Sequence, residues 1–229
     1  MISITDLKFQ YPRSDFELNI DSLNIAATEK VAIVGPSGSG KTTLLNLISG
    51  IALPNQGSVE VEDVSVSRLS DAERRDFRIR NIGMVFQQFE LVDYLNARDN
   101  ILLPFDINSS LGRNSTVVKQ SDAVAKELGL GNKLRRHPNQ LSQGEQQRVA
   151  ICRAVATQPK LILADEPTGN LDPANKTRIM KLLFQQVQEC GRTLVVVTHD
   201  MSLLDGFDRV IDFEQFRKVS STEATDGMG

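Results

Sequence analysis

A glycine-rich run that ends in lysine and threonine is the strongest chemical signal in the sequence. It has the spacing G-x-x-x-x-G-K-[ST] and lies between a short β-branched run and a stretch of helical spacing. The alternative, a flexible turn, would not require this position between a strand and a helix. Glycines let backbone N–H groups turn inward around phosphate oxygens, toward which the positive end of the next helix also points. Lys41 can reach the β- and γ-phosphates, and the Thr42 hydroxyl can hold Mg²⁺. The predicted nucleotide-binding residues are Gly35, Pro36, Ser37, Gly38, Ser39, Gly40, Lys41, Thr42 and Thr43.

Two adjacent carboxylates follow an apolar run farther along the chain. Residues 161–164 are all apolar, which is typical of a strand buried on both faces, and Asp165 and Glu166 follow directly. Neighbouring carboxylates at a buried sheet edge repel each other, and a divalent cation removes that difficulty. Asp165 is therefore predicted to hold Mg²⁺, directly or through water, and Glu166 to orient or deprotonate an attacking water. The alternative is a solvated carboxylate pair in a loop, which the phosphate-binding run upstream disfavours.

Hydrophobic patterning predicts the elements that must position these groups. Alternating or short apolar runs indicate strands, whereas apolar residues three and four apart indicate helices. Strands are expected within 2–7, 16–25, 31–34, 57–66, 83–86, 161–164, 194–197 and 210–213. Helices are expected at 41–51, 70–80 (with Ser70 and Glu73 as a capping box), 117–128, 143–156 and 173–189. Because no strand is expected from about 94 to 156, the pattern predicts an α/β core with a helical insertion at about 88–157.

Length and composition exclude several classes of protein. The chain has 229 residues, 40% of them hydrophobic and 24% charged, which fits one globular domain with an inserted subdomain. Its net charge of −3 gives no strong attraction to nucleic acid or to an anionic membrane. The apolar runs are far shorter than the about 20 residues of a membrane helix, and residues 1–8 do not resemble a signal peptide. Cys152 and Cys190 form no disulfide or metal pattern, so we expect a soluble intracellular protein.

The segment Leu141-Ser142-Gln143-Gly144-Glu145 resembles the signature motif of ABC ATPases, whose usual form is L-S-G-G-Q or L-S-G-G-E. Ser142 and the Gly144 amide lie at the start of an expected helix, which is an anion-binding position. In that family the motif closes onto the γ-phosphate held by the opposite subunit. The resemblance therefore implies that this chain needs a partner subunit to complete each ATP site. On its own, the segment would indicate only a capped, polar helix start.

Further positions resemble motifs of the same family, in the family's order along the chain. Gln87 resembles the Q-loop glutamine that approaches Mg²⁺, and Asn170-Leu171-Asp172 resembles the D-loop. His199 resembles the switch histidine that contacts the γ-phosphate, although a lone histidine is more often structural. Tyr11 resembles the aromatic residue that stacks on adenine. Two nearby aromatic residues compete with it for that role, Phe9 and Phe16.

Three positions depart from the family pattern. Gln143 replaces the first glycine of the signature pair, and Thr28 stands where many members have glycine before a turn. Neither position supplies an indispensable side chain, so we expect weakened turn geometry at most. Cys152 occupies a position often held by alanine and is expected to be a buried, inert thiol. Every residue that hydrolysis requires in the family is present.

The resemblance covers about residues 2–213 and implies a P-loop NTPase fold. This is an α/β fold with a core of mainly parallel sheet, an antiparallel β subdomain and the inserted helical subdomain. Residues 1–213 would form one ATPase domain, and 214–229 a flexible tail. The implied reaction is hydrolysis of ATP with Mg²⁺. The implied catalytic residues are Lys41, Glu166 and His199. Besides the glycine-rich run, the implied ATP contacts are Tyr11, Gln87, Ser142, Gly144, Glu145 and Asp172. The implied metal ligands are Thr42, Gln87 and Asp165.

The resemblance also implies partners. These are a second ATPase subunit, as a homodimer, and an integral membrane permease that docks around residues 87–94. No nucleic acid is expected, and the chain would lie on the cytoplasmic face of the inner membrane through the permease. Residues 98–104, 145–148 and 169–172 resemble the lipoprotein-release and macrolide-export branch, which works by mechanotransmission. Amino-acid importers share parts of this pattern and remain an alternative.

Three other functions stay open on the sequence. ABC-type ATPases of nucleic-acid repair or translation share the core but carry coiled-coil, zinc or paired-domain additions, and only a short basic cluster at 133–137 points to them. A small-molecule kinase with a P-loop would leave Ser142 and His199 unexplained. A structural regulator would bind ATP without hydrolysing it, even with its membrane partner.

Overall fold

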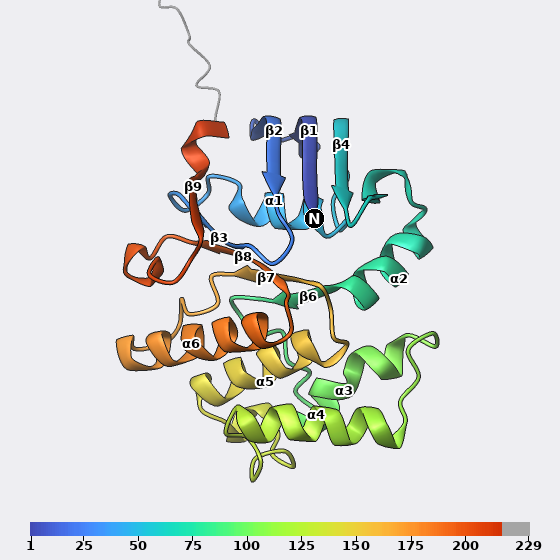
Figure 1. Ribbon diagram of the computed structural model, residues 1–229, viewed down its shortest axis with the longest axis vertical. Helices are drawn as coiled ribbons and strands as arrows, with labels where there is room; N and C mark the ends of the chain where they lie inside the picture. The colour runs from blue at the N-terminus through green and yellow to red at the C-terminus, as the bar shows by residue number, and fades with distance from the viewer. Residues whose placement is uncertain (217–229) are drawn as a thin grey trace, which may run out of the picture.

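The computed structural model describes residues 1–216 as two β-sheets and the helices that cover them. The first sheet is antiparallel, with the order β2-β1-β4-β5, and contains β1 (Ile2–Gln10), β2 (Glu17–Ile25), β4 (Gln56–Val61) and β5 (Val64–Ser65). The second is parallel, with the order β6-β7-β8-β3-β9, and contains β3 (Lys30–Val34), β6 (Ile82–Val85), β7 (Leu161–Asp165), β8 (Thr193–Thr198) and β9 (Arg209–Asp212). Figure 1 shows the first sheet above the second, with α1 (Lys41–Ile48) between them, α2 at the right beside the second sheet, and the helices α3 to α6 below it.

Period-two alternation in the parallel strands builds one hydrophobic core on each face of the sheet. Leu161 and Leu163 of β7 pack in the cluster that contains α1 and the first sheet. Ile162 and Ala164 pack in the cluster that contains α5 (Gln143–Ala156) and α6 (Pro173–Glu189). Both faces are apolar because α1 and the first sheet cover one side of the parallel sheet and helices cover the other. The polar residues that follow the strands therefore meet at one edge, where their carboxyl ends lie.

Helices fill the chain between β6 and β7, and the described residues form no strand there. They are α3 (Ala97–Ile107), α4 (Ser115–Glu127) and α5. The sequence pattern does not predict α3, because Pro104 lies inside it and the buried Asn100 interrupts its apolar face. Asn100 is satisfied by main-chain groups: its Oδ1 accepts from Val92 N at 2.7 Å, and its Nδ2 donates to Leu95 O at 3.0 Å. This residue fixes the chain before α3 against the helix.

Other helices lie close to their predicted bounds. α2 (Asp71–Asn81) begins with the predicted capping box of Ser70 and Glu73, and α5 and α6 have the predicted bounds. α1 ends at Ile48 and not at residue 51, because Gly50 adopts φ +69° and turns the chain back, so that Ile51 N donates to Asn46 O at 2.8 Å. Short 3₁₀ helices complete the chain: η1 (Val66–Arg68), η2 (Pro138–Gln140), η3 (Met201–Leu203) and η4 (Phe213–Phe216).

The C-terminal end of the predicted domain can be compared with the structure only in part. Residues 213–216 form η4, and residues 217–229, which make up most of the predicted flexible tail, lie outside the described residues. Within the described part of the chain, every helix is too short or too polar to span a bilayer.

Candidate functional site

The glycine-rich run joins β3 to α1 as a loop whose shape depends on its glycines. Gly38 (φ +75°) and Gly40 (φ +109°) lie in the left-handed region, which side-chain-bearing residues avoid. A Cβ atom built on Gly40 would also lie 2.4 Å from Cζ of Phe16, so glycine is required there on steric grounds. Gly40 is the N-cap of α1 and has no side chain that could cap the helix. The free N–H groups of the first helical turn therefore face the loop, as a phosphate site requires.

Two buried polar side chains inside the loop match the needs of a phosphate group. Lys41 Nζ donates to the carbonyl oxygens of Gly35 (2.7 Å) and Pro36 (2.9 Å), so its ammonium lies folded against the loop. Ser39 is 2% exposed, and its Oγ has no hydrogen-bond partner. A buried hydroxyl without a partner costs free energy, which a phosphate oxygen would recover. The loop thus fits the phosphates of a nucleotide on its own geometry.

A cavity of about 370 Å³ opens beside this loop. Its walls come from the loop, the β1–β2 hairpin and the carboxyl ends of β6 and β7. The lining residues are Tyr11, Phe16, Ser37, Gly38, Gly40, Lys41, Thr42, Thr43, Gln87, Asp165 and Glu166. The fold therefore brings most of the sequence-predicted nucleotide residues to one place. The lining residues lie up to 155 positions apart along the chain, from Tyr11 to Glu166.

Asp165 and Thr42 form the part of the site that suits a metal ion. Thr42 Oγ1 donates to Asp165 Oδ2 at 2.8 Å. Burial raises the pKa of Asp165 above its ordinary value and the neighbouring Glu166 adds to the rise, while the Thr42 hydrogen bond and Lys41 oppose it. A hydroxyl and a carboxylate are the oxygen ligands that Mg²⁺ prefers, and a cation would offset the cost of burying this charge. The donor set fits the predicted Mg²⁺ site.

Glu166 turns away from Asp165 and has partners of its own. It leaves the regular strand with φ +44°, and its carboxylate lies at the end of β8. Thr198 Oγ1 donates to Glu166 Oε2 at 3.1 Å, and His199 Nδ1 lies 2.7 Å from Oε1. An ionised carboxylate only accepts hydrogen bonds, so Nδ1 carries the proton in this pair. The two adjacent carboxylates therefore reach different elements, which reduces the repulsion expected from the sequence.

The residue after His199 fixes the position of this histidine. Asp200 accepts from Lys176 Nζ of α6 at 2.7 Å and from Ser202 N at 3.1 Å, where it caps η3. The hydrogen bond from Lys176 is the main cause that lowers the pKa of Asp200 to about 2, and Ser202 contributes to the shift. The His199 side chain itself remains 56% exposed. It can therefore contact a group that comes from outside the chain while it holds Glu166.

Two aromatic residues also line the cavity. Tyr11 is 38% exposed, and its hydroxyl lies 3.2 Å from Thr43 Oγ1. The ring of Phe9 packs edge-on against Tyr11 at 4.7 Å between centroids, but Phe9 is buried and lies outside the cavity. Phe16 lies 6.1 Å from Tyr11 and lines the cavity with it. In the sequence analysis Phe16 competes with Tyr11 for the adenine contact but is not among the predicted site residues. Its place across the β1–β2 hairpin from Tyr11 is the signal that could have found it.

Gln87 links the cavity to the segment that was predicted as the D-loop. It lies in the loop after β6, and its carbonyl accepts a hydrogen bond from Asn170 Nδ2 at 3.1 Å. A Cβ atom built on Gly169 would lie 3.3 Å from Gln87 Nε2, so the two segments are close along their side chains as well. The predicted Q-loop and D-loop are thus in direct contact within one chain.

The predicted signature residues do not line the cavity of their own chain. Ser142 caps α5: its Oγ accepts from Glu145 N at 3.3 Å, and the Glu145 carboxylate accepts from Ser142 N at 2.9 Å. The latter bond is the main cause of the lowered pKa of Glu145, which also pairs with Lys133 at 3.0 Å. Asp172 caps α6 by accepting from Asn175 N at 3.1 Å. Both motifs therefore begin helices away from the glycine-rich loop.

The departures from the family pattern have small structural effects. Gln143 is the first residue of α5, and the capping box around it is intact, so the turn is not weakened there. Thr28 adopts φ +64°, a conformation that suits glycine and strains a β-branched residue. Cys152 is buried as predicted, and burial raises the pKa of its thiol.

A comparison with known protein families gives the decisive match. The family model described as ABC transporter matches residues 18–169, a span that includes the glycine-rich loop, the signature segment and both carboxylates. The chain belongs to the ABC transporter family. Its predicted family and fold class are confirmed: it is an ABC transporter ATP-binding subunit and an ATPase with the P-loop fold of ABC cassettes.

Similar proteins also support the branch that the sequence resembles. The macrolide export ATP-binding/permease protein MacB of Rhodopirellula baltica is 44% identical over 215 residues, which cover 92% of this chain and 31% of that protein. The lipoprotein-releasing system ATP-binding protein LolD of Nitrobacter winogradskyi is 39% identical over 93% of this chain and 92% of that one. The chain thus spans about a third of the MacB relative and nearly all of the LolD relative.

Solved structures of ABC cassettes have the same fold. The dimeric, post-hydrolysis ATP-binding cassette MJ0796 bound to ADP and Pi has a TM-score of 0.80 and 37% identity, with 93% of this chain and 94% of that one covered. A second dimeric structure of MJ0796 gives a TM-score of 0.82. The agreement extends over both sheets and the helices between β6 and β7, since the coverage leaves few residues out.

Proposed function

We propose that this chain pairs with a second copy of itself on binding ATP and drives a separate membrane permease of the lipoprotein-release or macrolide-export type. The observation that carries the proposal is the separation of the two carboxylates beside the phosphate loop. Asp165 is held toward Thr42 and Glu166 toward His199, so one can bind a metal ion while the other acts on water. The relatives named LolD and MacB favour this branch over the amino-acid importers.

ATP occupies the cavity, with its phosphates against the glycine-rich loop and its adenine against Tyr11 and Phe16. Lys41 exchanges its contacts with the loop carbonyls for contacts with phosphate oxygens. Mg²⁺ held by Thr42, Asp165 and Gln87 would neutralise charge on the β- and γ-phosphates.

Glu166 serves as the general base for the attacking water. Thr198 and His199 hold its carboxylate in place, so that the base does not have to be ordered during the reaction. His199, which is more than half exposed, also faces the γ-phosphate. This arrangement supports the predicted catalytic roles of Lys41, Glu166 and His199.

The second subunit supplies the rest of each site. Ser142 and the Gly144 amide lie at the positive end of α5 but outside their own cavity, and Asp172 begins α6 in the same way. A copy of the chain placed face to face would bring these helix starts to the γ-phosphate. Pairing is supported by the two solved structures of MJ0796, which share the fold and are dimeric.

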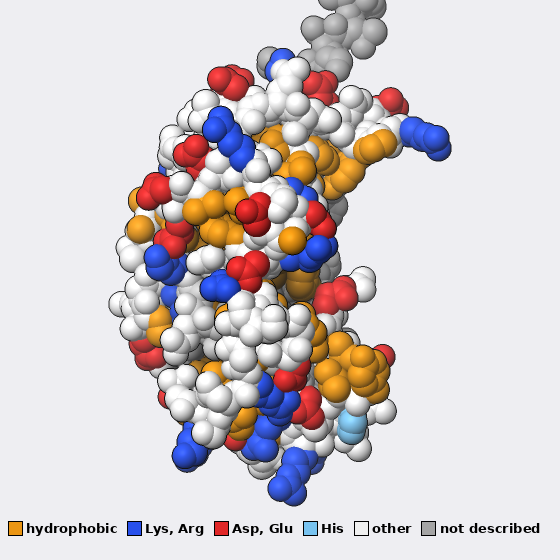
Figure 2. Space-filling model, turned by 90° about the vertical axis from the view of Figure 1, so that its right-hand side faces the viewer, with side chains coloured by type: hydrophobic (Ala, Val, Ile, Leu, Met, Phe, Trp, Pro, Cys, Tyr) orange, Lys and Arg blue, Asp and Glu red, His pale blue; other side chains and the backbone are white. Residues whose placement is uncertain are grey.

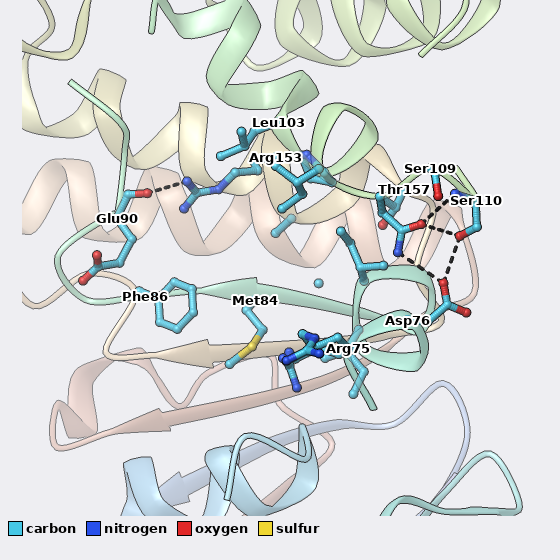
Figure 3. Close-up of a pocket in the computed structure, with 18 of the residues that line it drawn as sticks. Arg75, Asp76, Met84, Phe86, Glu90, Leu103, Ser109, Ser110, Arg153 and Thr157 are labelled. Carbon is cyan, nitrogen blue, oxygen red and sulfur yellow. Dashed lines mark hydrogen bonds between the residues drawn. The ribbon is translucent and has the colours of Figure 1, made fainter. Parts of the chain in front are cut away.

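The permease docks in a groove of about 640 Å³ between α2, β6 and α3. Apolar side chains line it, among them Met84, Phe86 and Leu103, with Arg75 at the rim (Figure 3). Figure 2 shows the side of the molecule that carries α2 and α3, where hydrophobic patches alternate with charged ones and the outline is hollowed. Phe86 directly precedes Gln87, so the groove adjoins the ATP cavity. The chain would then lie at the cytoplasmic face of the membrane through its permease.

The Glu166→Gln variant tests the catalytic assignment. The amide keeps the size of the side chain but cannot accept the proton, so we expect ATP binding to persist, turnover to stop and an ATP-bound dimer to accumulate. Size-exclusion chromatography with ATP and a phosphate-release assay measure both effects. Glu189→Gln, an exposed carboxylate at the far end of α6, is the matched control and should behave as the wild type. Normal turnover in Glu166→Gln would remove Glu166 from the mechanism.

A docking variant tests the partner. Leu103→Glu places a charge on the apolar side of the groove and should reduce co-purification with a candidate permease that has four membrane helices and a large extracytoplasmic domain. Ile51→Glu, an exposed apolar residue outside the groove, is the control. Equal recovery of the permease by both variants would place the docking surface elsewhere.

A further inference from the structure

The turn between the ATP cavity and the groove has an unusual backbone. Phe89 (φ +62°) and Glu90 (φ +48°) are consecutive residues in the left-handed region, and neither is glycine. Within the turn, Phe89 N donates to Phe86 O at 3.2 Å and Glu90 N to Gln88 O at 2.6 Å. Each left-handed residue with a side chain costs free energy, so this turn needs support from outside itself.

Arg153 supplies that support from α5. Its Nη2 donates to Phe89 O at 2.6 Å and its Nη1 donates to Glu90 O, so one guanidinium binds the carbonyls of both left-handed residues. Figure 3 shows the Arg153 side chain extended from the helix toward the carbonyl of Glu90. Among the described residues, the side-chain hydrogen bonds of Arg153 end on main-chain oxygens of the turn. Each carbonyl is thus bound by a separate nitrogen of one planar group, whereas a lysine at this position would offer a single nitrogen on a shorter side chain.

The clamped turn lies between three parts of the molecule. Gln87, which lines the ATP cavity, lies within the turn 86–90, and Phe86 and Glu90 line the groove. α5, which carries Arg153, begins at the signature segment. The other end of α5, which carries Arg153, packs tightly on β6, because a Cβ atom built on Gly83 would lie 2.2 Å from Ala154 O. A shift of Gln87 therefore cannot leave Arg153 and its helix unaffected.

We propose that Arg153 is a positioning residue that holds the turn 86–90 in its left-handed shape and thereby couples Gln87 at the ATP cavity to the signature helix α5. The proposal rests on the proposed roles of Gln87 and of the signature segment. Arg153 touches neither the nucleotide cavity nor the two carboxylates, and it acts through the main chain of the turn. Its loss uncouples the two elements without removing a ligand of ATP.

The Arg153→Lys variant tests this role. It keeps the charge but replaces the two planar nitrogens with one nitrogen on a shorter side chain, so at least one of the two bonds is lost. We therefore expect kcat for ATP hydrolysis to fall by about tenfold, while the KM for ATP stays within about twofold. Hydrogen–deuterium exchange should become faster in the peptide that spans 86–92 and stay unchanged in the loop 35–43. A general structural defect would instead raise KM and speed exchange in both peptides, and that result would overturn the proposal, as would a wild-type kcat.

Two double variants separate the turn from the charge at position 90. Glu90→Gly and Glu90→Ala both remove the carboxylate, but only glycine adopts the left-handed conformation at little cost. Arg153→Lys combined with Glu90→Gly should recover most of the lost kcat and of the exchange protection, and Arg153→Lys combined with Glu90→Ala should not. Equal recovery by both would overturn the proposal.

A further control keeps the proposed function apart from the clamp. Gln87→Ala should lower kcat in the wild-type background, because Gln87 is a proposed metal ligand. If Gln87→Ala has no effect while Arg153→Lys still alters exchange in 86–92 and kcat, the role of Gln87 fails but the clamp on α5 stands. If Gln87→Ala acts and Arg153→Lys does not, the clamp fails and the proposed function stands.

Discussion

Replacement of His199 by alanine tests how the structure holds its general base. Glu166 receives two side-chain hydrogen bonds, from Thr198 Oγ1 at 3.1 Å and from His199 Nδ1 at 2.7 Å. The His199→Ala change removes the shorter bond and leaves Thr198 on the other carboxylate oxygen. The Glu166 side chain, which is only 12% exposed, then keeps one restraint and gains freedom to rotate.

The size of the effect follows from this geometry. A hydrogen bond to a charged group contributes about 1.5–3 kcal/mol, and the 56% exposure of the His199 side chain favours the lower end, because water replaces part of the lost bond. A loss of about 1.5 kcal/mol in the transition state is about a tenfold loss of kcat. The KM for ATP should change by less than about twofold, because His199 does not line the nucleotide cavity. A loss beyond about a hundredfold would mean that the proposed contact of His199 with the γ-phosphate contributes more than its bond to Glu166.

Steady-state phosphate release with increasing ATP measures both constants. His137→Ala is the matched control, since His137 is the second of the two histidines and lies at the N-cap of η2, away from the cavity. It should keep the wild-type kcat. An unchanged kcat in His199→Ala, or a loss that appears in KM alone, would refute the reasoning that this histidine orients Glu166.

Three further changes test other parts of the structure. Asp165→Asn should lower hydrolysis by about a hundredfold or more. It should also raise the stability of the nucleotide-free chain at pH 7, because the pKa of Asp165 is raised in the folded state: the stability that this carboxyl contributes is fully present below its ordinary pKa and is lost as the pH rises through its folded pKa. The melting temperatures of variant and wild type should therefore converge at acidic pH. Thr28→Gly should stabilise the fold by about 1 kcal/mol in urea unfolding, since relief of left-handed strain exceeds the added entropy of the unfolded chain, whereas Thr28→Ala should gain less than half of that. Tyr11→Ala should raise the KM for ATP by about tenfold, because the base loses its stacking partner. Tyr11→Phe should raise the KM by less than twofold, because the hydroxyl makes only a long contact with Thr43, at 3.2 Å. Equal effects of the two variants would exclude stacking.

Local signals in the sequence predicted the parts of the fold that depend on local chemistry. The spacing of Gly35, Gly40 and Lys41 indicated the phosphate loop because the glycines let backbone N–H groups turn inward and the lysine reaches the phosphates. The helices at 143–156 and 173–189 have the predicted bounds, since Ser142 and Pro173 are strong start signals. The apolar run 161–164 indicated β7 because four successive apolar residues are typical of a strand buried on both faces.

Features that depend on distant partners could not be predicted. α3 was missed because Asn100, a polar residue in the middle of the helix, is satisfied by carbonyls of the preceding segment, which the pattern does not show. Phe16 was not assigned to the site because its place beside Tyr11 depends on the hairpin register, in which Gln10 pairs with Glu17. The bonds of Arg153 to Phe89 and Glu90 join positions more than sixty residues apart and end on main-chain atoms, so no side-chain pattern reveals them.

The folded position of Lys41 has a consequence for how nucleotides compete for this protein. Its ammonium already has two acceptors, the carbonyls of Gly35 and Pro36, so the arrival of a phosphate exchanges acceptors and does not satisfy a free charge. The loop carbonyls act as a tethered competitor that is always present at the site. The measured affinity for a nucleotide is therefore the difference between two similar interactions, whereas adenosine, which has no phosphate, binds without this exchange. A change that weakens the grip of the loop on its own lysine should accordingly tighten the binding of ATP and leave that of adenosine unaltered.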